Sequence, residues 1–223
     1  MENFLYMKKD KMHCQFIKNI ICNWMKDRLQ DSGCEGFVVG VSGGIDSALV
    51  STLCANTGIK TIVIGMPINQ EERQVSRSMS HMKWLTDIYP NVEQKNIDLT
   101  SVYDSYVQML LPIGMSELAN ANLQSRLRMC CLYAVSNTEN CIVAGTGNKV
   151  EDYGIGFFTK YGDGGVDISP IADLLKSEVR ELANFLNISQ EIIKAKPTDG
   201  LWGDNRSDEE QIGATYEELE WAM

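Results

Sequence analysis

Residues 36–47 have the sequence GFVVGVSGGIDS, in which a short apolar run meets a turn of glycine and serine. The apolar part, Gly36–Val41, is rich in β-branched residues, which is typical of a strand buried on both faces of a parallel sheet. After the turn, Ser47–Asn56 has the composition and length of a helix. This stretch therefore predicts a strand, a tight turn and a helix in direct succession.

The segments on either side predict an α/β fold. Apolar residues recur at helical spacing between Met12 and Leu29, and Thr61–Met66 indicates a second buried strand. The other expected elements are a helix at Glu71–Ile88, a weaker strand at Val92–Leu99, a helix at Asn120–Ser136, a strand at Asn140–Ala144, a helix at Asp173–Leu186, a polar loop at Pro197–Ser207 and a short acidic terminal helix. This alternation predicts a doubly wound, mostly parallel sheet with helices on both faces, whose ligands lie at the carboxyl ends of the strands.

Length and charge limit the classes of function. With 223 residues and 44% hydrophobic content, we expect residues 1–223 to form a single domain with a sizeable core. The formal net charge is −10, which argues against nucleic acid or an anionic membrane as a partner, because such binding relies on a basic surface. A polyanionic ligand would require a local concentration of positive charge.

The cysteines and the hydropathy pattern indicate a compartment. The first residues lack a signal-peptide pattern, and no apolar run approaches the ~18 residues that span a bilayer. The chain has seven cysteines and no C-x-x-C pair, which fits reduced core thiols better than disulfides or a zinc site. We therefore expect a cytoplasmic protein.

The turn Ser42–Ser47 indicates a phosphate site. Its glycines let the backbone approach an anion, and the free N–H groups at the start of the next helix favour phosphate there. Asp46 would repel phosphate unless a divalent cation bridges the two, so its position predicts magnesium. The sequence lacks the GK[ST] ending of a Walker A loop. On these residues alone, a plain glycine turn that caps a helix remains the alternative.

Three motifs carry a resemblance to a known family. SGGIDS after an apolar strand resembles the loop of the N-type ATP pyrophosphatases, which cleave ATP between its α- and β-phosphates and have an adenine nucleotide α-hydrolase-like, Rossmann-like fold. Residues 145–151, GTGNKVE, and residues 157–170, FFTKYGDGGVDISP, resemble the signature of the NAD synthetases within that superfamily. Asn122–Arg126 and Pro197–Thr198 are similar to two further family segments, so the resemblance extends over nearly all of the chain from Gly36 onward.

The resemblance implies an ammonia-dependent NAD synthase, a carbon–nitrogen ligase of NAD biosynthesis. Such an enzyme adenylates the carboxylate of deamido-NAD with ATP, releases pyrophosphate, and lets ammonia displace AMP. The family also implies a homodimer whose deamido-NAD sites lie at the subunit interface, near Asn122–Tyr133 here. No segment resembles a glutaminase domain, so free ammonia is the simpler nitrogen donor, although a separate glutaminase acting in trans remains open.

The resemblance implies a set of ATP and metal contacts. The implied ATP-binding residues are Val41, Ser42, Gly43, Gly44, Asp46, Ser47, Thr146, Lys176 and Thr198. The implied magnesium ligands are Asp46, Glu151 and Thr198, since hard cations prefer oxygen ligands. Lys176 corresponds to the lysine that the family directs at the ATP phosphates.

A second set of residues is implied for deamido-NAD: Arg126, Phe157, Lys160, Asp163 and Asp167. Asp163 is expected to act in catalysis with Asp46 and Lys176, by orienting or deprotonating the attacking ammonia. The residues Leu118, Gln124 and Gln211 depart from the usual family pattern, which leaves the dinucleotide contacts in doubt. We expect the loops Gly154–Gly165 and Thr198–Ser207 to act as lids.

Two other functions compete with this interpretation. One is another enzyme with the same ATP-cleaving loop that amidates or thiolates a different acceptor, which would be expected to lack the block FFTKYGDGGVD. The other is a catalytically silent homologue that only binds nucleotides, against which the presence of Asp46, Glu151, Asp163 and Lys176 argues.

Overall fold

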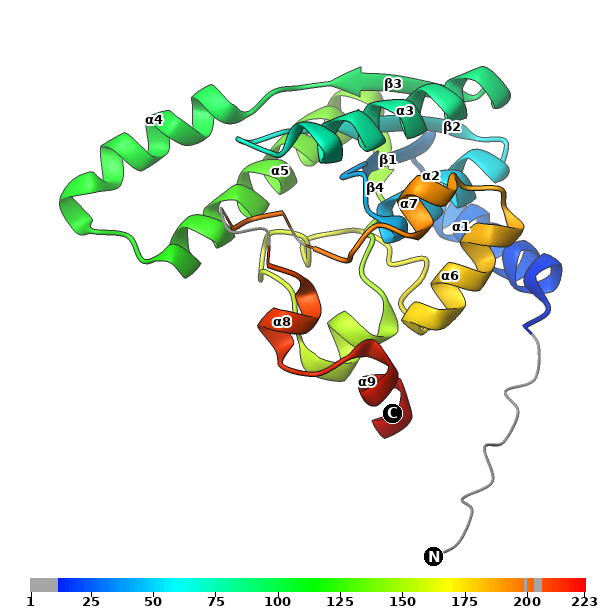
Figure 1. Cartoon of the computed structure of the whole chain (residues 1–223). Coiled ribbons are helices and arrows are strands. Elements are labelled where there is room, and N and C mark those ends of the chain that lie inside the picture. The colour runs from blue at the N-terminus through cyan, green and yellow to red at the C-terminus, as the bar shows by residue number, and fades with distance from the viewer. Residues whose placement is uncertain (1–11, 199, 203–205) are drawn as a thin grey trace, which may run out of the picture.

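The computed structural model describes residues 12–198, 200–202 and 206–223. These residues form a parallel β-sheet with helices packed around it (Figure 1). The four strands of this sheet are β1 (Gly36–Gly40), β2 (Lys60–Gly65), β3 (Val92–Asn96) and β4 (Cys141–Val143). Their order is β3-β2-β1-β4, and every pairing is parallel. The chain moves outward from β1 to β3 and then returns to the other side of β1. The switch point therefore lies between β1 and β4, where α/β sheets bind their ligands.

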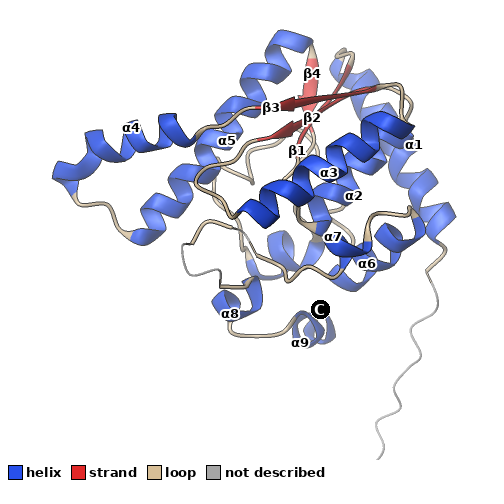
Figure 2. Ribbon diagram, turned by 45° about the horizontal axis from the view of Figure 1, so that its top comes forward, coloured by secondary structure: helices blue, strands red, loops and turns tan. Residues whose placement is uncertain are grey.

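Helices cover both faces of the sheet (Figure 2). The helices of the chain before β4, whether or not they touch the sheet, are α1 (Cys14–Ser32), α2 (Ile45–Asn56), α3 (Glu72–Ile88), α4 (Thr100–Leu110), the 3₁₀ turn η1 (Leu111–Ile113) and α5 (Glu117–Glu139). Those after β4 are the π-helical turn η2 (Lys149–Ile155), α6 (Lys176–Phe185), α7 (Gln190–Ile193), α8 (Asp208–Ile212) and α9 (Tyr216–Ala222). Within the described part of the chain, no helix is long and apolar enough to cross a membrane.

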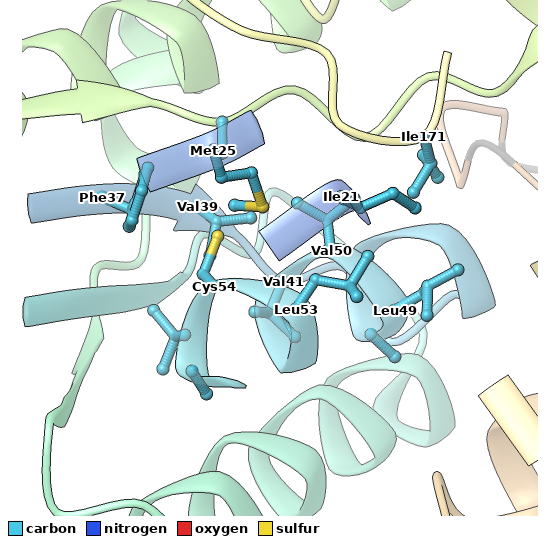
Figure 3. Packing of buried hydrophobic residues seen from close by; sticks show 14 of the residues in the cluster. Ile21, Met25, Phe37, Val39, Val41, Leu49, Val50, Leu53, Cys54 and Ile171 are labelled. Atoms are coloured by element: carbon cyan, nitrogen blue, oxygen red, sulfur yellow. The ribbon is translucent and has the colours of Figure 1, made fainter. Parts of the chain in front are cut away.

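The side chains of β1 alternate between two apolar clusters, as the period of a strand requires. Val39 belongs to the larger cluster, in which Met25 of α1 and Leu53 of α2 are fully buried (Figure 3). Val38 points to the opposite face, where it joins Ile62 and the inner side of α5. Each fully buried side chain of this size contributes roughly 1.5–3 kcal/mol. The sheet is thus a rigid platform for the loops at its edge.

The predicted fold class is confirmed: the sheet is parallel and carries helices on both faces. Most predicted elements are present with shifted ends. The strand expected at Val92–Leu99 ends at Asn96, and the helix expected at Asp173–Leu186 begins at Lys176. The helix expected at Asn120–Ser136 is longer, because Ser116 caps its start by accepting a hydrogen bond from the Ala119 N–H at 3.2 Å.

Helix α4, which is not among the predicted elements, extends away from the sheet together with the first part of α5 (Figure 1). None of the residues of α4 is buried. Its apolar residues Val102, Tyr106 and Met109 lie at helical spacing but remain exposed. The periodicity was therefore present in the sequence, without the buried partner that usually accompanies it.

Candidate active site

The turn between β1 and α2 is held in shape by its own hydroxyl groups. Ser47 Oγ donates to the Gly44 carbonyl at 3.0 Å and accepts from the Ser42 N–H at 3.2 Å. Gly43 has φ +86°, and a Cβ there would lie 2.6 Å from the backbone oxygen of Gln74. Only glycine satisfies both conditions without strain. The turn thus presents the N-terminus of α2, with its free N–H groups and positive dipole end, in a fixed position.

The loop after β4 is tied to this turn by Asn148, whose side chain is fully buried. Asn148 Nδ2 donates to Asp46 Oδ1 at 3.0 Å. Its Oδ1 accepts from the N–H groups of Val150 and Glu151, so it also caps η2. Sequence reasoning missed this role, although Asn148 lies inside the GTGNKVE motif. A π-helical turn is rare and often marks a functional site, and here it brings Glu151 to Asp46.

Lys176 lies between these two carboxylates with only 2% of its side chain exposed. Its Nζ is 2.6 Å from Asp46 Oδ2 and 2.8 Å from Glu151 Oε1. Burial opposes the charge of the lysine, but the two carboxylates outweigh that cost and raise the pKa of Lys176. Burial likewise opposes the charge of Glu151, and the lysine more than compensates, lowering its pKa. Asp46 differs from Glu151, because burial outweighs the attraction of Lys176 and raises the pKa of Asp46.

Tyr216, at the start of α9, completes this cluster and was not identified from the sequence. Its hydroxyl donates to Glu151 Oε1 at 2.5 Å and to Asp208 Oδ2 at 3.3 Å. Its ring lies 4.9 Å from Lys176 Nζ, a cation–π contact. Burial, followed by the charge of Glu151, raises the pKa of Tyr216, so the phenol remains a neutral donor. The last helix of the chain thus supports a carboxylate that lies 65 positions earlier.

The donor set fits a magnesium ion. Asp46 and Glu151 both contact Lys176 Nζ, so the two carboxylates lie close together with the lysine nitrogen between them. Within the described ranges, no group of three or more His, Cys, Asp or Glu residues could hold a metal alone. Magnesium is usually held by one or two carboxylates together with substrate phosphates and water, which two neighbouring carboxylates satisfy.

Two adjoining cavities lie beside these loops. The charged cavity, of about 150 Å³, contains the ion cluster just described. The apolar cavity, of about 400 Å³, is lined by α5 and the loops after β1 and β4. Side chains that line the apolar cavity include Met66, Leu132, Phe157, Val166 and Trp202. Residues that line both cavities are Ser42, Ser47, Thr146, Phe157, Asp163 and Thr198, which defines a junction between the two.

Asp163 is fixed at this junction by α5. Its Oδ1 accepts from Ser125 Oγ at 2.7 Å and from the Thr159 N–H at 3.0 Å. Gly162 allows this contact, because a Cβ there would lie 2.6 Å from Ser125 Oγ. In the sequence, Ser125 is only one residue of a segment similar to the family. The structure shows that its hydroxyl positions the Asp163 carboxylate.

Asp152 is a further carboxyl in the charged cavity that sequence reasoning missed. Burial, together with the charges of Glu151, Asp163 and Asp46, raises the pKa of Asp152 to about 7. The absence of a side chain at Gly147 leaves room for this carboxyl group. The cavity therefore carries more acid than the sequence motifs indicated.

The residues implied for ATP gather around the two cavities. Val41, Ser42, Ser47, Thr146 and Thr198 line the apolar cavity, and Gly44, Asp46 and Lys176 line the charged one, as does the implied metal ligand Glu151. Gly43 was also implied for ATP, but it lines neither cavity. Thr198 also closes its own loop, because its Oγ1 donates to the Arg206 carbonyl at 3.0 Å. The expected lid Thr198–Ser207 includes Asp199 and residues 203–205, which lie outside the described residues.

The residues implied for deamido-NAD divide into two groups. Phe157 and Asp163 line both cavities. The other three, Arg126, Lys160 and Asp167, are exposed side chains outside the lining of either cavity. Arg126 Nε donates to the Lys160 carbonyl at 3.2 Å. Asp167 accepts from Tyr133 OH at 2.9 Å and from the Val143 N–H at 2.7 Å, which fastens its loop to the end of β4.

The three departures from the family pattern all lie at the apolar cavity. Leu118 and Gln211 line it, and Leu118 is 60% exposed. Gln124 is buried and donates to the Leu201 carbonyl at 3.2 Å, next to the lining residue Trp202. This side of the site thus differs more from the expected pattern than the charged side does.

Comparison with known proteins gives consistent matches. The family model described as NAD synthase matches residues 17–223. The NH(3)-dependent NAD(+) synthetase of Methanococcoides burtonii is 39% identical over 204 residues, which cover 91% of this chain and 76% of that protein. The protein of the same name from Mycoplasmopsis pulmonis is 40% identical over 201 residues, covering 90% and 75% respectively.

Two solved structures resemble this fold closely. One is an NMN synthetase from Francisella tularensis, with a TM-score of 0.87 and 33% identity over 94% of this chain and 85% of that one. The other is an NH3-dependent NAD synthetase from Campylobacter jejuni in complex with the nitrate ion, with a TM-score of 0.75 and 32% identity over 82% and 78%.

Proposed function

Because the chain belongs to the NAD synthase family, we propose that it uses ATP and ammonia to convert the carboxylate of deamido-NAD into the amide of NAD. A carboxylate oxygen of deamido-NAD attacks the α-phosphorus of ATP, and pyrophosphate leaves. Ammonia then attacks the activated carbonyl carbon, and AMP leaves with that oxygen. The observation that carries the proposal is the junction of two cavities at Asp163, one rich in charge and one apolar.

ATP is proposed to span this junction. Its adenosine and α-phosphate would contact Val41, Ser42 and Thr146 in the apolar cavity, and the outer phosphates would extend past Gly44 into the charged one. The rigid backbone at Gly43 and Gly44 supports this arrangement, since a fixed set of N–H donors binds phosphate without reorganisation.

Asp46 and Glu151 are proposed to hold Mg²⁺, which would neutralise charge on the departing pyrophosphate. The closeness of the two carboxylates supports this role, and Lys176 Nζ would have to move from its position between them to admit the ion. Lys176 itself would contribute positive charge toward the phosphates. Thr198, the third proposed ligand, would have to give up its hydrogen bond to the Arg206 carbonyl.

Asp163 is proposed to orient the attacking ammonia and to accept its proton. Because Ser125 and the Thr159 N–H hold Oδ1, the carboxylate has a defined direction at the junction. Phe157 is proposed to stack on the pyridine ring, since it lines both cavities. Asp167 would keep the same loop attached to β4.

The working enzyme is proposed to be a homodimer in which a second copy completes the deamido-NAD site. Arg126 and Lys160 support this proposal, because both are exposed and lie outside the cavities of one chain. The arm formed by α4 and the start of α5 exposes large apolar side chains, namely Met109, Leu111, Ile113 and Leu118. A patch of this kind favours contact with another protein surface.

The remaining expectations also stand as proposals. Residues 1–223 would act as one domain with free ammonia as the nitrogen donor and work in the cytoplasm. All seven cysteines are free thiols in the structure, which supports a reducing compartment.

A direct assay tests the proposed function. Purified protein is incubated with ATP, Mg²⁺, ammonium and deamido-NAD, and NAD, AMP and pyrophosphate are measured in parallel. The expected result is equal formation of the three products, with none when any substrate is omitted. Formation of AMP only with another acceptor, or no turnover of ATP at all, would contradict the proposal.

The similarity to an NMN synthetase favours a second candidate substrate, nicotinic acid mononucleotide. It carries the same reacting carboxylate on a smaller nucleotide, so the charged cavity and Asp163 would act identically. The apolar side, where Leu118 and Gln211 depart from the family pattern, would decide between the two. Comparing kcat/KM for both acceptors under identical conditions distinguishes these candidates.

A further inference from the structure

The charged cavity has an excess of negative groups for a site that is to receive a polyphosphate. Among the residues that the structure describes, its acidic lining residues are Asp46, Glu151, Asp152, Asp163 and Asp208. Its basic lining residues are Arg77, Lys176 and Lys196. A triphosphate adds further negative charge, so each basic group that is still free to meet it matters.

Two of the three basic groups already have carboxylate partners. Lys176 is paired with Asp46 and Glu151, as described above. Lys196 Nζ lies 3.2 Å from Glu210 Oε1 on the exposed rim. Arg77, in contrast, makes no ion pair with any described residue. It is the basic group of this lining whose charge no carboxylate neutralises.

Arg77 is also held beside the glycine turn. It lies on α3, and its Nε donates to the Gly43 carbonyl at 3.3 Å. Helix α3 is fastened to the same turn by Ser78 Oγ, which donates to the Val41 carbonyl at 2.7 Å. Within the described ranges, that bond from Nε is the one hydrogen bond of the guanidinium, so its terminal NH₂ groups remain available to a ligand.

We propose that Arg77 binds the β- and γ-phosphates of ATP, the part that leaves as pyrophosphate. The assignment rests on the proposed function for the identity of the nucleotide. Arg77 lines the charged cavity and is not part of the apolar lining, whereas the junction residues, where the α-phosphate would lie, line both. A planar guanidinium offers two parallel N–H groups to phosphate oxygens, a geometry that an ammonium group lacks.

The test measures equilibrium binding of AMP and of inorganic pyrophosphate to the full chain by calorimetry, with Mg²⁺ present. The variants are Arg77→Ala, Arg77→Lys and Arg73→Ala. Arg73 is a matched control because it lies one turn earlier on α3, is exposed and is absent from the cavity lining. We expect Arg77→Ala to weaken pyrophosphate binding at least tenfold and AMP binding less than twofold, and Arg73→Ala to change neither.

The conservative variant guards against a purely structural effect. Arg77→Lys keeps the charge and α3, so it remains informative even where Arg77→Ala fails to fold. We expect it to weaken pyrophosphate binding severalfold while AMP binding is preserved. Equal losses for AMP and pyrophosphate, or wild-type affinity for both, in this variant would overturn the proposal.

This experiment is independent of the acceptor. If the Arg77 variants weaken pyrophosphate binding and preserve AMP binding as expected, but the wild-type protein forms no NAD from deamido-NAD, the Arg77 assignment stands and the proposed function is wrong. If NAD formation is normal and the Arg77 variants bind pyrophosphate with wild-type affinity, only the Arg77 assignment is wrong.

Discussion

The two halves of the candidate active site differ in how completely one chain builds them. In the charged cavity, Asp46, Lys176, Glu151 and Tyr216 come from α2, α6, η2 and α9 and bond directly to one another. In the apolar cavity, which is more than twice as large, Leu118 is 60% exposed. One half is built from side chains that are hydrogen-bonded to one another, and the other is bordered by exposed apolar surface.

The difference follows from the cost of burying each kind of group. A buried charge that loses its partner costs about 3–5 kcal/mol, so a cluster of ions must be assembled fully within the fold. Apolar surface loses only about 25 cal/mol per Å² when it stays exposed, so a chain tolerates an open apolar wall until a ligand or a second copy covers it. We therefore assign phosphate chemistry to the charged half and substrate choice to the apolar one.

The largest effect is expected from Asp46→Ala in the charged half. The change removes a proposed magnesium ligand and one partner of Lys176, so kcat should fall at least about a thousandfold. AMP release measured at saturating ATP and Mg²⁺ checks this. Asp87→Ala is the control, because Asp87 is an exposed residue of α3 that forms an ion pair with Lys83, and it should retain normal turnover. Near-normal activity of Asp46→Ala would remove the metal assignment.

Asp163→Asn tests the junction. The amide can still accept from Ser125, but it cannot take a proton from ammonia, so kcat should fall about a hundredfold. ATP affinity should change little, since the charged half is intact. Steady-state kinetics with ammonium varied, together with ATP binding by calorimetry, separate the two effects. A loss confined to ATP binding would show that Asp163 belongs functionally to the charged half instead.

Tyr216→Phe should have a smaller effect in the charged half. The ring and its contact with Lys176 are kept, and the hydroxyl contacts with Glu151 and Asp208 are lost, of which the one to Glu151 is the shorter. Hydrogen bonds to charged groups contribute about 1.5–3 kcal/mol, so we expect kcat/KM for ATP to fall about tenfold. A matching rise in the Mg²⁺ concentration needed for half-maximal rate would identify Glu151 as the group affected. Unchanged Mg²⁺ dependence would argue for a structural role of α9 alone.

Asp152 provides a stability test of the same half. Its pKa is about 7 in the folded protein and near 3.8 in the unfolded chain, so between these values the folded state keeps a proton that the unfolded state loses. The contribution of Asp152 to the free energy of unfolding should therefore fall as the pH rises from 4 to 7. Asp152→Asn should remove about 1 kcal/mol of this decline, after allowance for solvent screening. Urea unfolding in the presence of a metal chelator at several pH values measures it, and parallel pH profiles of variant and wild type would contradict it.

The sequence predicted the fold through its buried strands and the glycine turn between Gly36 and Ser47. Those signals are local, because a β-branched apolar run followed by a glycine turn indicates a strand and its end within a few neighbouring residues. Helix α4 was not predicted, and none of its residues is buried in the structure.

The candidate site was predictable only where a motif carried it. Asp46, Glu151, Asp163 and Lys176 lie within or between quoted motifs, and the structure brings them to adjoining cavities. The holding residues escaped, because their roles arise from contacts between distant segments. Tyr216 meets Glu151 across 65 positions and Ser125 meets Asp163 across 38, and no spacing in the sequence encodes either contact.

The most direct test of the central claim follows an oxygen atom. Deamido-NAD labelled with ¹⁸O in its reacting carboxylate is incubated with ATP, Mg²⁺, ammonium and the protein, and the products are analysed by mass spectrometry. If the carboxylate attacks the α-phosphorus at the junction, one ¹⁸O appears in AMP and none in pyrophosphate. Unlabelled AMP formed together with NAD would show that the carboxylate is activated in another way. This result would contradict the proposal that the carboxylate meets the α-phosphorus at the junction of the two cavities.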